Sequence, residues 1–305
     1  MRRFALFFLP LPLLATTWYV NLGGLGGQED YESRFKAQIE ELNKLTAAAP
    51  GARVFSFAGP ALSKIKVRDA LAQIAREAKP DDTLVLTLIG HGTFDGSDYK
   101  FNIPGPDIKP KELALWLLPV PAKRQLVVNP TSASGASLAD LRQEGRTVIT
   151  ATKTGTEKLA TVFARFWLED LRDPQSDADK NDIVSALEAY RYADTKTTKY
   201  FESNQRLASE HALIADTSSS QGWRTPDSTK GEAMVAMRMP VLVFGSLQNA
   251  AKSPEKQTLL RQREELEQRI DNLNLRKAAM PAEQYRLEMR NLLLQVARVQ
   301  QELDK

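Results

Sequence analysis

The sequence predicts an α/β protein: an open, mainly parallel β-sheet with helices on both faces, followed by an α-helical hairpin or coiled coil. Short apolar segments that predict buried strands alternate with amphipathic segments that predict helices. Polar or glycine-rich turns separate the two kinds of segment. From residue 253 onward the composition changes to Gln, Glu, Arg, Lys and Leu without glycine, as in coiled coils.

The first half of the chain shows the alternation most clearly. We expect strands at 18–22, 53–57, 84–90 and 125–129, helices at 30–45, 67–78 and 109–118, and a polar hairpin or loop at 93–101. The first of these helices places Phe35, Ile39 and Leu42 on one face, which predicts that this face packs on the sheet.

The second half continues the pattern with longer helices. We expect a helix from about Ser137, a strand at 146–151, helices at 156–171 and 184–207, and a last strand at 239–244. The first long helix would bury Leu159 together with Phe163 and Trp167, and the second would be broken near 194–198. Pro240 predicts that the last strand begins there or lies at an edge.

The C-terminal segment, residues 253–305, has two apolar repeats of seven residues. Leu259, Leu266 and Leu273 form the first repeat, and Met289, Val296 and Leu303 form the second. Pro281 between them fits the first turn of a second helix. We therefore expect a helical hairpin or coiled-coil tail that binds a coiled-coil partner or associates with itself.

Length, composition and charge limit the class of protein. The 305 residues allow one large domain with appendages, and 42% hydrophobic and 26% charged residues are ordinary for a globular chain. A net charge of +3 without a basic cluster predicts no nucleic-acid partner. The chain has no cysteine, which excludes disulfides, thiolate metal sites and a cysteine nucleophile.

Residues 1–15 begin with two arginines close to the N-terminus and continue with a short apolar run that ends at Ala15. This pattern predicts an export signal, and a short uncleaved anchor is the alternative because Leu13 is a poor residue three positions before a cut. We therefore expect an exported protein, periplasmic or membrane-associated, whose main domain occupies residues 16–250.

The strand at 84–90 is the most apolar of the chain, and it ends at Gly90-His91-Gly92. In an open α/β sheet, ligands bind at the carboxyl ends of the strands, so we expect an exposed His91 imidazole at this edge. The next strand ends in the hydroxyl-rich segment 130–137. Neighbouring parallel strands would bring the two loops together, so that a hydroxyl could reach His91.

The chain resembles the legumain-like C13 peptidases of the caspase-like fold over about residues 16–246, on the segments 84–92 and 126–135. The resemblance implies His91 as catalytic base. Aligning Ser134-Gly135 with the Ser-Gly of the family places Ser132 at the position of the nucleophilic cysteine, and Thr131 is an alternative hydroxyl. The asparagine that supports the histidine in the family falls at Gly26 here.

Three functions remain open, because a serine hydroxyl needs an aligned base and usually a third group to orient that base. The first is a catalytically impaired pseudopeptidase that binds a peptide or protein. The second is an active hydrolase that uses Ser132 or Thr131 with His91, and with the backbone amide near Gly92 as oxyanion donor. The third is a scaffold that assembles through its C-terminal tail.

Two further positions bear on binding. In the resembled family, the segment that corresponds to 150–155 helps to line the specificity pocket, and Lys153 in it would suit an acidic or polar side chain. His211 lies among apolar and small residues, which predicts a packed, hydrogen-bonded side chain rather than a metal ligand.

Residues 177–188 have the donor spacing of an EF-hand calcium loop. Side-chain oxygens occur at loop positions 1, 3, 5, 9 and 12, and position 7 would supply a backbone carbonyl: Asp177, Asp179, Asn181, Ser185 and Glu188, with Ile183 at position 7. Asp182 stands at position 6, where the motif has glycine. The alternative is a polar turn in which Ser185 or Asp182 caps the next helix and Glu188 completes a capping box. We thus expect no required cofactor, with structural calcium as the one candidate.

Overall fold

The computed structural model describes residues 15–217, 219, 221–243 and 253–305. The predicted export segment, apart from Ala15, lies outside the described residues. The chain divides into two compact units, one comprising Thr16–Gly245 and the other containing Ser246–Lys305. Within the described ranges, no helix combines the length and apolarity needed to span a membrane.

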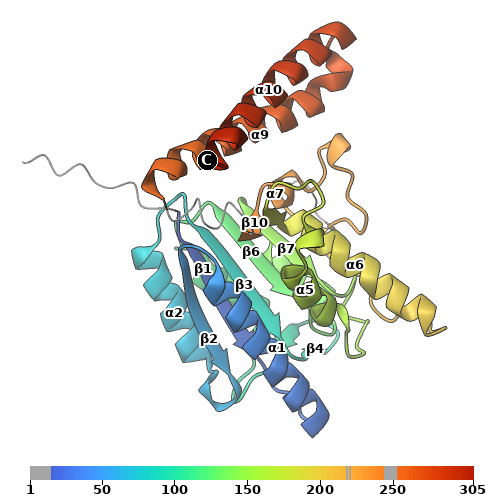
Figure 1. Ribbon diagram of the computed structural model, residues 1–305. Helices are drawn as coiled ribbons and strands as arrows, with labels where there is room; N and C mark the ends of the chain where they lie inside the picture. Colours follow the sequence, from blue (N-terminus) through green and yellow to red (C-terminus); the bar gives the residue numbers. More distant parts are fainter. Residues whose placement is uncertain (1–14, 218, 220, 244–252) are drawn as a thin grey trace, which may run out of the picture. The chain divides into compact units, whose positions relative to one another are not determined.

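A six-stranded sheet forms the centre of the Thr16–Gly245 unit, in the order β2-β1-β3-β6-β7-β9 (Figure 1). Its strands are β1 Thr17–Gly23, β2 Ala52–Ala58, β3 Thr83–Ile89, β6 Arg124–Asn129, β7 Arg146–Thr150 and β9 Leu213–Ala215. All neighbours are parallel except β9, which runs antiparallel to β7. Every residue of β3 is buried, as its apolar sequence predicts.

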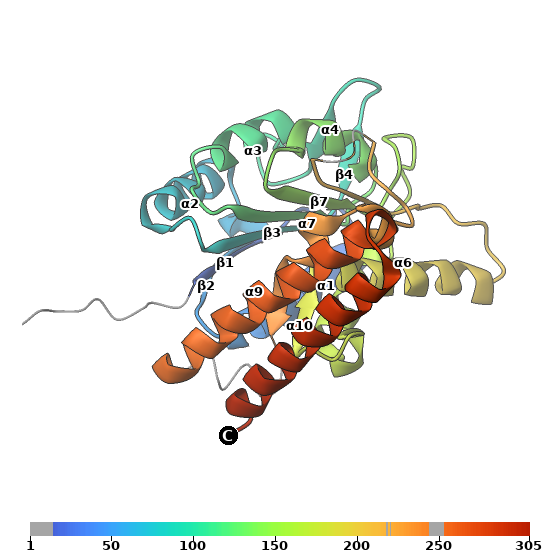
Figure 2. The ribbon, with the colours of Figure 1, turned by 90° about the horizontal axis from the view of Figure 1, so that it is seen from above.

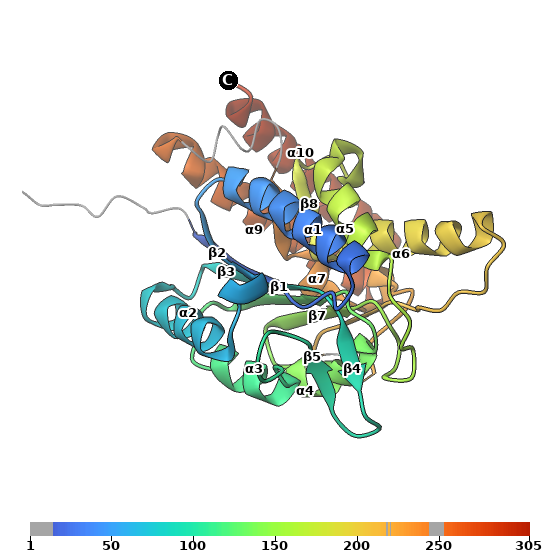
Figure 3. The same ribbon diagram turned by 90° about the horizontal axis from the view of Figure 1, so that it is seen from below.

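Helices cover both faces of this sheet (Figures 2 and 3). One face carries α1 Glu29–Ala48, α5 Phe163–Arg172, α6 Ala186–Ser203 and α7 Met234–Met237; the other carries α2 Lys64–Glu77, α3 Pro110–Leu117 and α4 Leu138–Leu141. Strand residues alternate between the faces, so that Tyr19 packs with Phe35 of α1 whereas Val20 packs with Val67 of α2. The predicted α/β class is therefore confirmed.

The remaining elements are short. β4 Gly92–Phe94 and β5 Tyr99–Phe101 form a hairpin, and β8 Ile183–Ser185 pairs antiparallel with β10 Pro240–Val243 outside the main sheet. The 3₁₀ turns are η1 Gly59–Ala61, η2 Ser134–Ser137, η3 Pro174–Ser176, η4 Ser228–Lys230 and η5 Lys277–Ala279.

The structure corrects several predicted boundaries. Helix α5 begins at Phe163 rather than at 156, and Leu159, expected to be buried, is 66% exposed. The cause is Glu210, whose buried carboxylate accepts hydrogen bonds from the N–H groups of Val162 at 2.7 Å and Phe163 at 3.3 Å and so fixes the helix start.

Other differences concern the second half of the domain. The helix expected from about Ser137 is only η2 followed by the four residues of α4. Helix α6 runs unbroken through 194–198, because Ala193, Thr197 and Phe201 form one continuous buried stripe. The last strand does begin at Pro240, but it pairs with β8, whereas the edge strand next to β7 in the main sheet is the unpredicted β9.

The tail is a pair of packed helices, α9 Pro254–Arg276 and α10 Ala282–Leu303, so the predicted helical hairpin is confirmed. In α9, Leu266 and Leu273 of the first predicted repeat are buried and Leu259 is half-buried. In α10 the buried apolar residues are Leu292, Val299 and Leu303, so of the predicted second repeat Leu303 is buried, whereas Met289 and Val296 are half-buried. Pro281 is the residue before α10 rather than a residue of its first turn.

Candidate functional site

The carboxyl ends of β1, β3, β6 and β7 form one edge of the sheet, here called the rim: residues 23–27, 90–92, 130–137 and 150–155. Its loops approach so closely that glycine is needed. A Cβ on Gly92 would lie 2.4 Å from the carbonyl oxygen of Ser132, and one on Gly135 would lie 2.3 Å from the carbonyl carbon of Lys153. The loops that follow β3 and β6 thus lie side by side, as the parallel order predicts.

His91 is half-buried rather than exposed, because α1 covers it. Its ring lies edge-on to the rings of Tyr31 and Phe35, with centroid separations of 4.7 Å and 5.0 Å. Burial lowers the pKa of His91 below the ordinary value of 6.5, and the nearby Arg34 lowers it further. A hydrogen bond to the backbone of Gly26 acts in the opposite direction. A neutral imidazole at pH 7 follows.

Ser132 is 3% exposed, and its hydroxyl is committed to the backbone of Gly92. The hydroxyl donates to the Gly92 carbonyl oxygen at 2.9 Å and accepts from the Gly92 N–H at 3.3 Å. In the part of the chain that the structure describes, no hydrogen bond joins His91 to Ser132. The same contact engages the Gly92 amide, the group expected as oxyanion donor.

Thr131 is fully buried and belongs to a separate polar cluster. Its hydroxyl donates to Asn129 Oδ1 at 2.8 Å and lies 2.6 Å from the Tyr99 hydroxyl. Burial raises the pKa of Tyr99 to about 12, so this phenol stays neutral and cannot serve as a base at pH 7. The cluster holds the loop after β6 against the β4–β5 hairpin.

The loop after β7 carries an exposed lysine of the rim, Lys153. Ser134 Oγ accepts from the N–H groups of Ala151 at 3.1 Å and Thr152 at 3.2 Å, which fixes the start of this loop. Lys153 is exposed, and its N–H donates to the Glu157 carboxylate at 2.7 Å.

The opposite oxygen of Glu157 lies 2.5 Å from His211 Nδ1, so His211 is a hydrogen-bonded histidine as predicted. Sequence reasoning did not identify Glu157, nor did it place Tyr31 and Phe35 around His91. The sequence predicted Phe35 as a buried residue of a helix, but nothing in that helix predicted that it would contact His91 after β3.

The EF-hand-like loop joins α5 to α6 and brings its acidic residues together. Carboxylate oxygens of Asp177, Asp179 and Glu188 lie within 4.8 Å of one another. Ser185 is the N-cap of α6, and Glu188 completes a capping box with it, so the predicted cap is present.

The other positions of this loop also have defined structure. Asp182 adopts a φ of 63°, the left-handed conformation for which the motif uses glycine. Asn181 Oδ1 accepts from the N–H of Ile183 at 2.8 Å, and Ile183 begins β8. The capping box and a metal loop are compatible. In the capping box, the N–H and the hydroxyl of Ser185 donate to Glu188 Oε2, so the other carboxylate oxygen, Oε1, still faces the loop.

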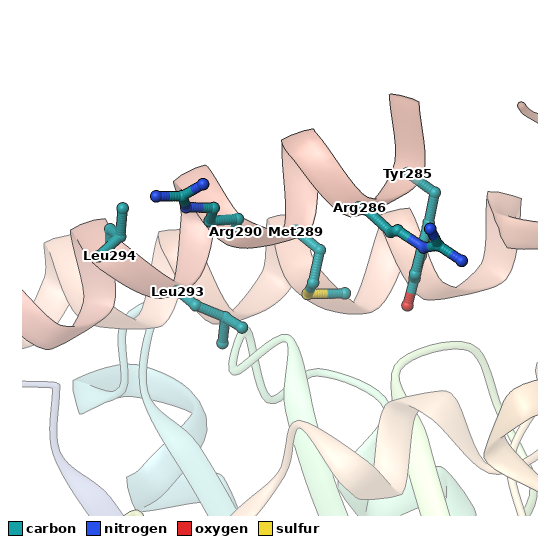
Figure 4. Close-up of a pocket in the computed structure, with 6 residues that line it drawn as sticks. All are labelled: Tyr285, Arg286, Met289, Arg290, Leu293 and Leu294. Carbon is teal, nitrogen blue, oxygen red and sulfur yellow. The ribbon is translucent and has the colours of Figure 1, made fainter. Parts of the chain in front are cut away.

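The helical tail has a pocket of about 410 Å³ on α10 (Figure 4). Its lining combines apolar side chains with two arginines: Tyr285, Arg286, Met289, Arg290, Leu293 and Leu294. Leu293 is 52% exposed and Leu294 is 48% exposed. This side of α10 is therefore apolar without being covered by α9.

No protein-family model matches the sequence. No curated protein matches it either. Several solved structures are similar in outline. Protein GSU0716 from Geobacter sulfurreducens has a TM-score of 0.44 at 12% identity, covering 69% of this chain and 97% of that one.

Two caspases give similar values. The Drosophila initiator caspase Dronc has a TM-score of 0.43 at 12% identity, covering 66% of this chain and 79% of that one. Caspase-1 from Spodoptera frugiperda has a TM-score of 0.44 at 13% identity, covering 66% and 86%. Values this low establish neither a family nor an activity for this chain.

Proposed function

We propose that this protein is a pseudopeptidase: a caspase-like, C13-related peptidase homologue that binds a peptide or protein segment at the rim without cutting it. The observation that carries the proposal is the pair of hydrogen bonds between the Ser132 hydroxyl and the Gly92 backbone. To act as a nucleophile, Ser132 would have to leave both bonds and turn toward a base that it does not touch.

The state of the two candidate hydroxyls supports the same conclusion. Acyl transfer needs a nucleophile that substrate can reach, and Ser132 and Thr131 are 3% and 0% exposed. Each also donates a hydrogen bond to an internal oxygen: Ser132 to the Gly92 carbonyl and Thr131 to Asn129 Oδ1. The chain has no cysteine that could replace them.

The exposed charges of the rim indicate the kind of ligand. Lys153 forms no ion pair with another described residue. Arg34 is exposed and lies over the Tyr31 and Phe35 rings at 4.7 Å and 5.2 Å, beside His91. A peptide with an acidic or polar side chain would find two cations here, Lys153 and Arg34.

The experiment is a peptide-library screen with the purified full-length protein, which reads out both retention and cleavage. We expect retention of acidic peptides and no cleavage products. Lys153→Gln should weaken binding, whereas Lys158→Gln, an equally exposed lysine five residues away, should not. Cleavage products that disappear in His91→Ala would replace the proposal by the hydrolase function.

A second candidate function is assembly through the tail, and the apolar surface of α10 favours it. Leu287, Leu293 and Leu294 are 61%, 52% and 48% exposed, far more than the leucines between the two helices. The expected partner is the same surface of a second copy. Light scattering, with the mass divided by that of one chain, should then show fewer subunits for Leu293→Gln and for deletion of 253–305. Leu207→Gln is the control, because Leu207 is 95% exposed in the other unit. An unchanged number of subunits after the deletion would exclude assembly through the tail.

A further inference from the structure

We propose that the loop between α5 and α6, residues 177–188, binds one Ca²⁺ ion. The loop presents oxygen donors at positions 1, 3, 5, 9 and 12, the pattern with which 12-residue loops surround this cation. Neither the proposed peptide binding nor the tail uses these residues, so the site stands or falls independently of both.

The fold brings the strongest of these donors together in space. Asp177 is 4% exposed, and its carboxylate lies within 4.8 Å of donor atoms of Asp179 and Glu188. These three residues come from the start of the loop and the first turn of α6, so the gathering reflects folding rather than sequence proximity alone. Three carboxylates at this spacing repel one another unless a cation lies between them.

Asp170 in α5 is a second, independent sign of a cation. It is fully buried, and neither of its carboxylate oxygens has a hydrogen-bond partner. It lies close enough to Glu188 for the two carboxylates to interact electrostatically. A carboxyl buried without a hydrogen-bond donor is unfavourable in its charged form. A cation held by Glu188 would stabilise that form.

No basic side chain fulfils this role in the described residues. Ion pairs of lysine, arginine and histidine are found elsewhere in the domain, for example Lys196 with Glu169 at 2.8 Å and His211 with Glu157 at 2.5 Å. None of the described ion pairs includes Asp170, Asp177, Asp179 or Glu188. The negative charge is thus concentrated and lacks a compensating side chain.

The donor chemistry favours Ca²⁺ over other metals. Every side-chain donor is an oxygen, which excludes a preference for zinc or copper. Ca²⁺ accepts six to eight oxygens in irregular geometry, whereas Mg²⁺ requires a near-ideal octahedron. The loop offers carboxylates, the Asn181 amide and the Ile183 carbonyl, and Glu188 Oε1 is held only by N–H contacts of 3.1 Å and 3.4 Å from Ala178 and Asp179. The first is an ordinary hydrogen bond and the second is a long one, so a cation would share this oxygen with them.

Binding of Ca²⁺ to this loop would restrict the relative movement of three elements of the domain: α5, β8 and α6. The loop follows α5, continues into β8 and ends in α6, and β8 pairs with β10 at the end of the unit. We therefore expect Ca²⁺ to stabilise the folded domain rather than to open it, because a single loop contributes ligands.

The test is isothermal titration calorimetry of the full-length, chelator-treated protein with CaCl₂, together with melting curves in Ca²⁺ and in EDTA. We expect one ion per chain and a melting temperature several degrees higher in about 1 mM Ca²⁺, the upper range of dissociation constants for such loops. Mg²⁺ at the same concentration should give a smaller shift.

Two variants identify the ligands while preserving the local hydrogen bonds. Glu188→Gln keeps an acceptor for the capping box and should weaken Ca²⁺ binding by more than about 100-fold, and Asp179→Asn should also weaken it. Asp95→Asn is the control, because Asp95 accepts from the N–H groups of Ser97 and Asp98 in a comparable exposed turn. Equal melting temperatures of Glu188→Gln and the unmutated protein in EDTA would show that the variant is folded.

Two results would overturn the proposal. One is the absence of both binding heat and a melting shift in Ca²⁺. The other is Ca²⁺ binding by Glu188→Gln and Asp179→Asn as tight as that of the unmutated protein, which would place the ion elsewhere. Neither result bears on peptide binding at the rim.

Discussion

At the scale of single residues, the decisive feature is that the backbone of Gly92 engages the hydroxyl of Ser132, the residue that stands at the expected nucleophile position. Gly92 gives Ser132 both a donor and an acceptor. The contact requires glycine, because a Cβ would be 2.4 Å from Ser132 O and from the Tyr99 ring. The Ser132 hydroxyl therefore has a structural role that needs no base.

Ser132→Ala tests this structural role. Removal of the hydroxyl leaves the buried Gly92 N–H and carbonyl without that partner, and we expect a loss of about 1–3 kcal/mol in the free energy of unfolding. Ser203→Ala, at the exposed end of α6, should change it by less than about 0.5 kcal/mol. Urea denaturation measures both. Equal effects of the two substitutions would show that the Gly92 contact contributes nothing.

Glu210 predicts a specific pH dependence of stability. Burial raises the pKa of its carboxyl to about 7, with Glu157 adding to the rise and the N–H groups of Val162 and Phe163, together with Arg34, opposing it. The folded state therefore binds a proton between pH 4.5 and about 7 that the unfolded state has released. This contribution favours folding at low pH and is lost as the pH rises through that window.

Glu210→Gln should remove this contribution. Between pH 5 and pH 7.5 the unmutated protein should lose about 2 kcal/mol more unfolding free energy than the variant, on the basis of the pKa difference. Urea titrations of both proteins at the two pH values give the comparison. Parallel pH profiles would contradict the assignment of a raised pKa to this residue.

Sequence reasoning placed the residues of the rim but not their contacts. The strand before His91 and the strand before Thr131 could be recognised from apolar runs, so their loops could be placed together. The partner of the Ser132 hydroxyl could not be predicted, because it depends on how closely the Gly92 backbone approaches the loop after β6. The same holds for the Glu157–His211 pair, whose members are 54 residues apart.

At the scale of elements, apolar periodicity gave the location of most helices but not always their ends. Helix α5 is the clearest case, since residues 156–162 share its pattern and yet lie outside it. The end is decided by Glu210, which comes from a distant segment. β9 was missed because three residues are too few to show a period.

The tail offers a direct test of which leucines hold two helices together. Leu292 and Leu293 are neighbours in α10, but they are 6% and 52% exposed. Leu292→Ala should lower the stability of the hairpin by about 2–5 kcal/mol, and Leu293→Ala should lower it by less than about 0.5 kcal/mol. Calorimetric melting of the full-length protein resolves the difference. The reverse order would mean that the helices pack through the other face.

At the scale of the whole molecule, the binding functions and the assembly function that we propose belong to different units. The Thr16–Gly245 unit holds the rim and the acidic loop, and the helical hairpin provides an apolar surface for assembly. The mainly parallel direction of the strands was predictable, because apolar strands that alternate with helices favour that arrangement. The function of the rim could not be predicted in the same way, because it depends on whether the side chains of His91 and Ser132 contact each other.

The most direct test of the pseudopeptidase proposal is intact-mass spectrometry of the full-length protein after incubation with an acylating phosphonate probe. We predict an unchanged mass, because the hydroxyls of Ser132 and Thr131 are buried and bonded internally. Covalent labelling that maps to Ser132, and that is lost in His91→Ala, would contradict the account and show that the rim is an active hydrolase site.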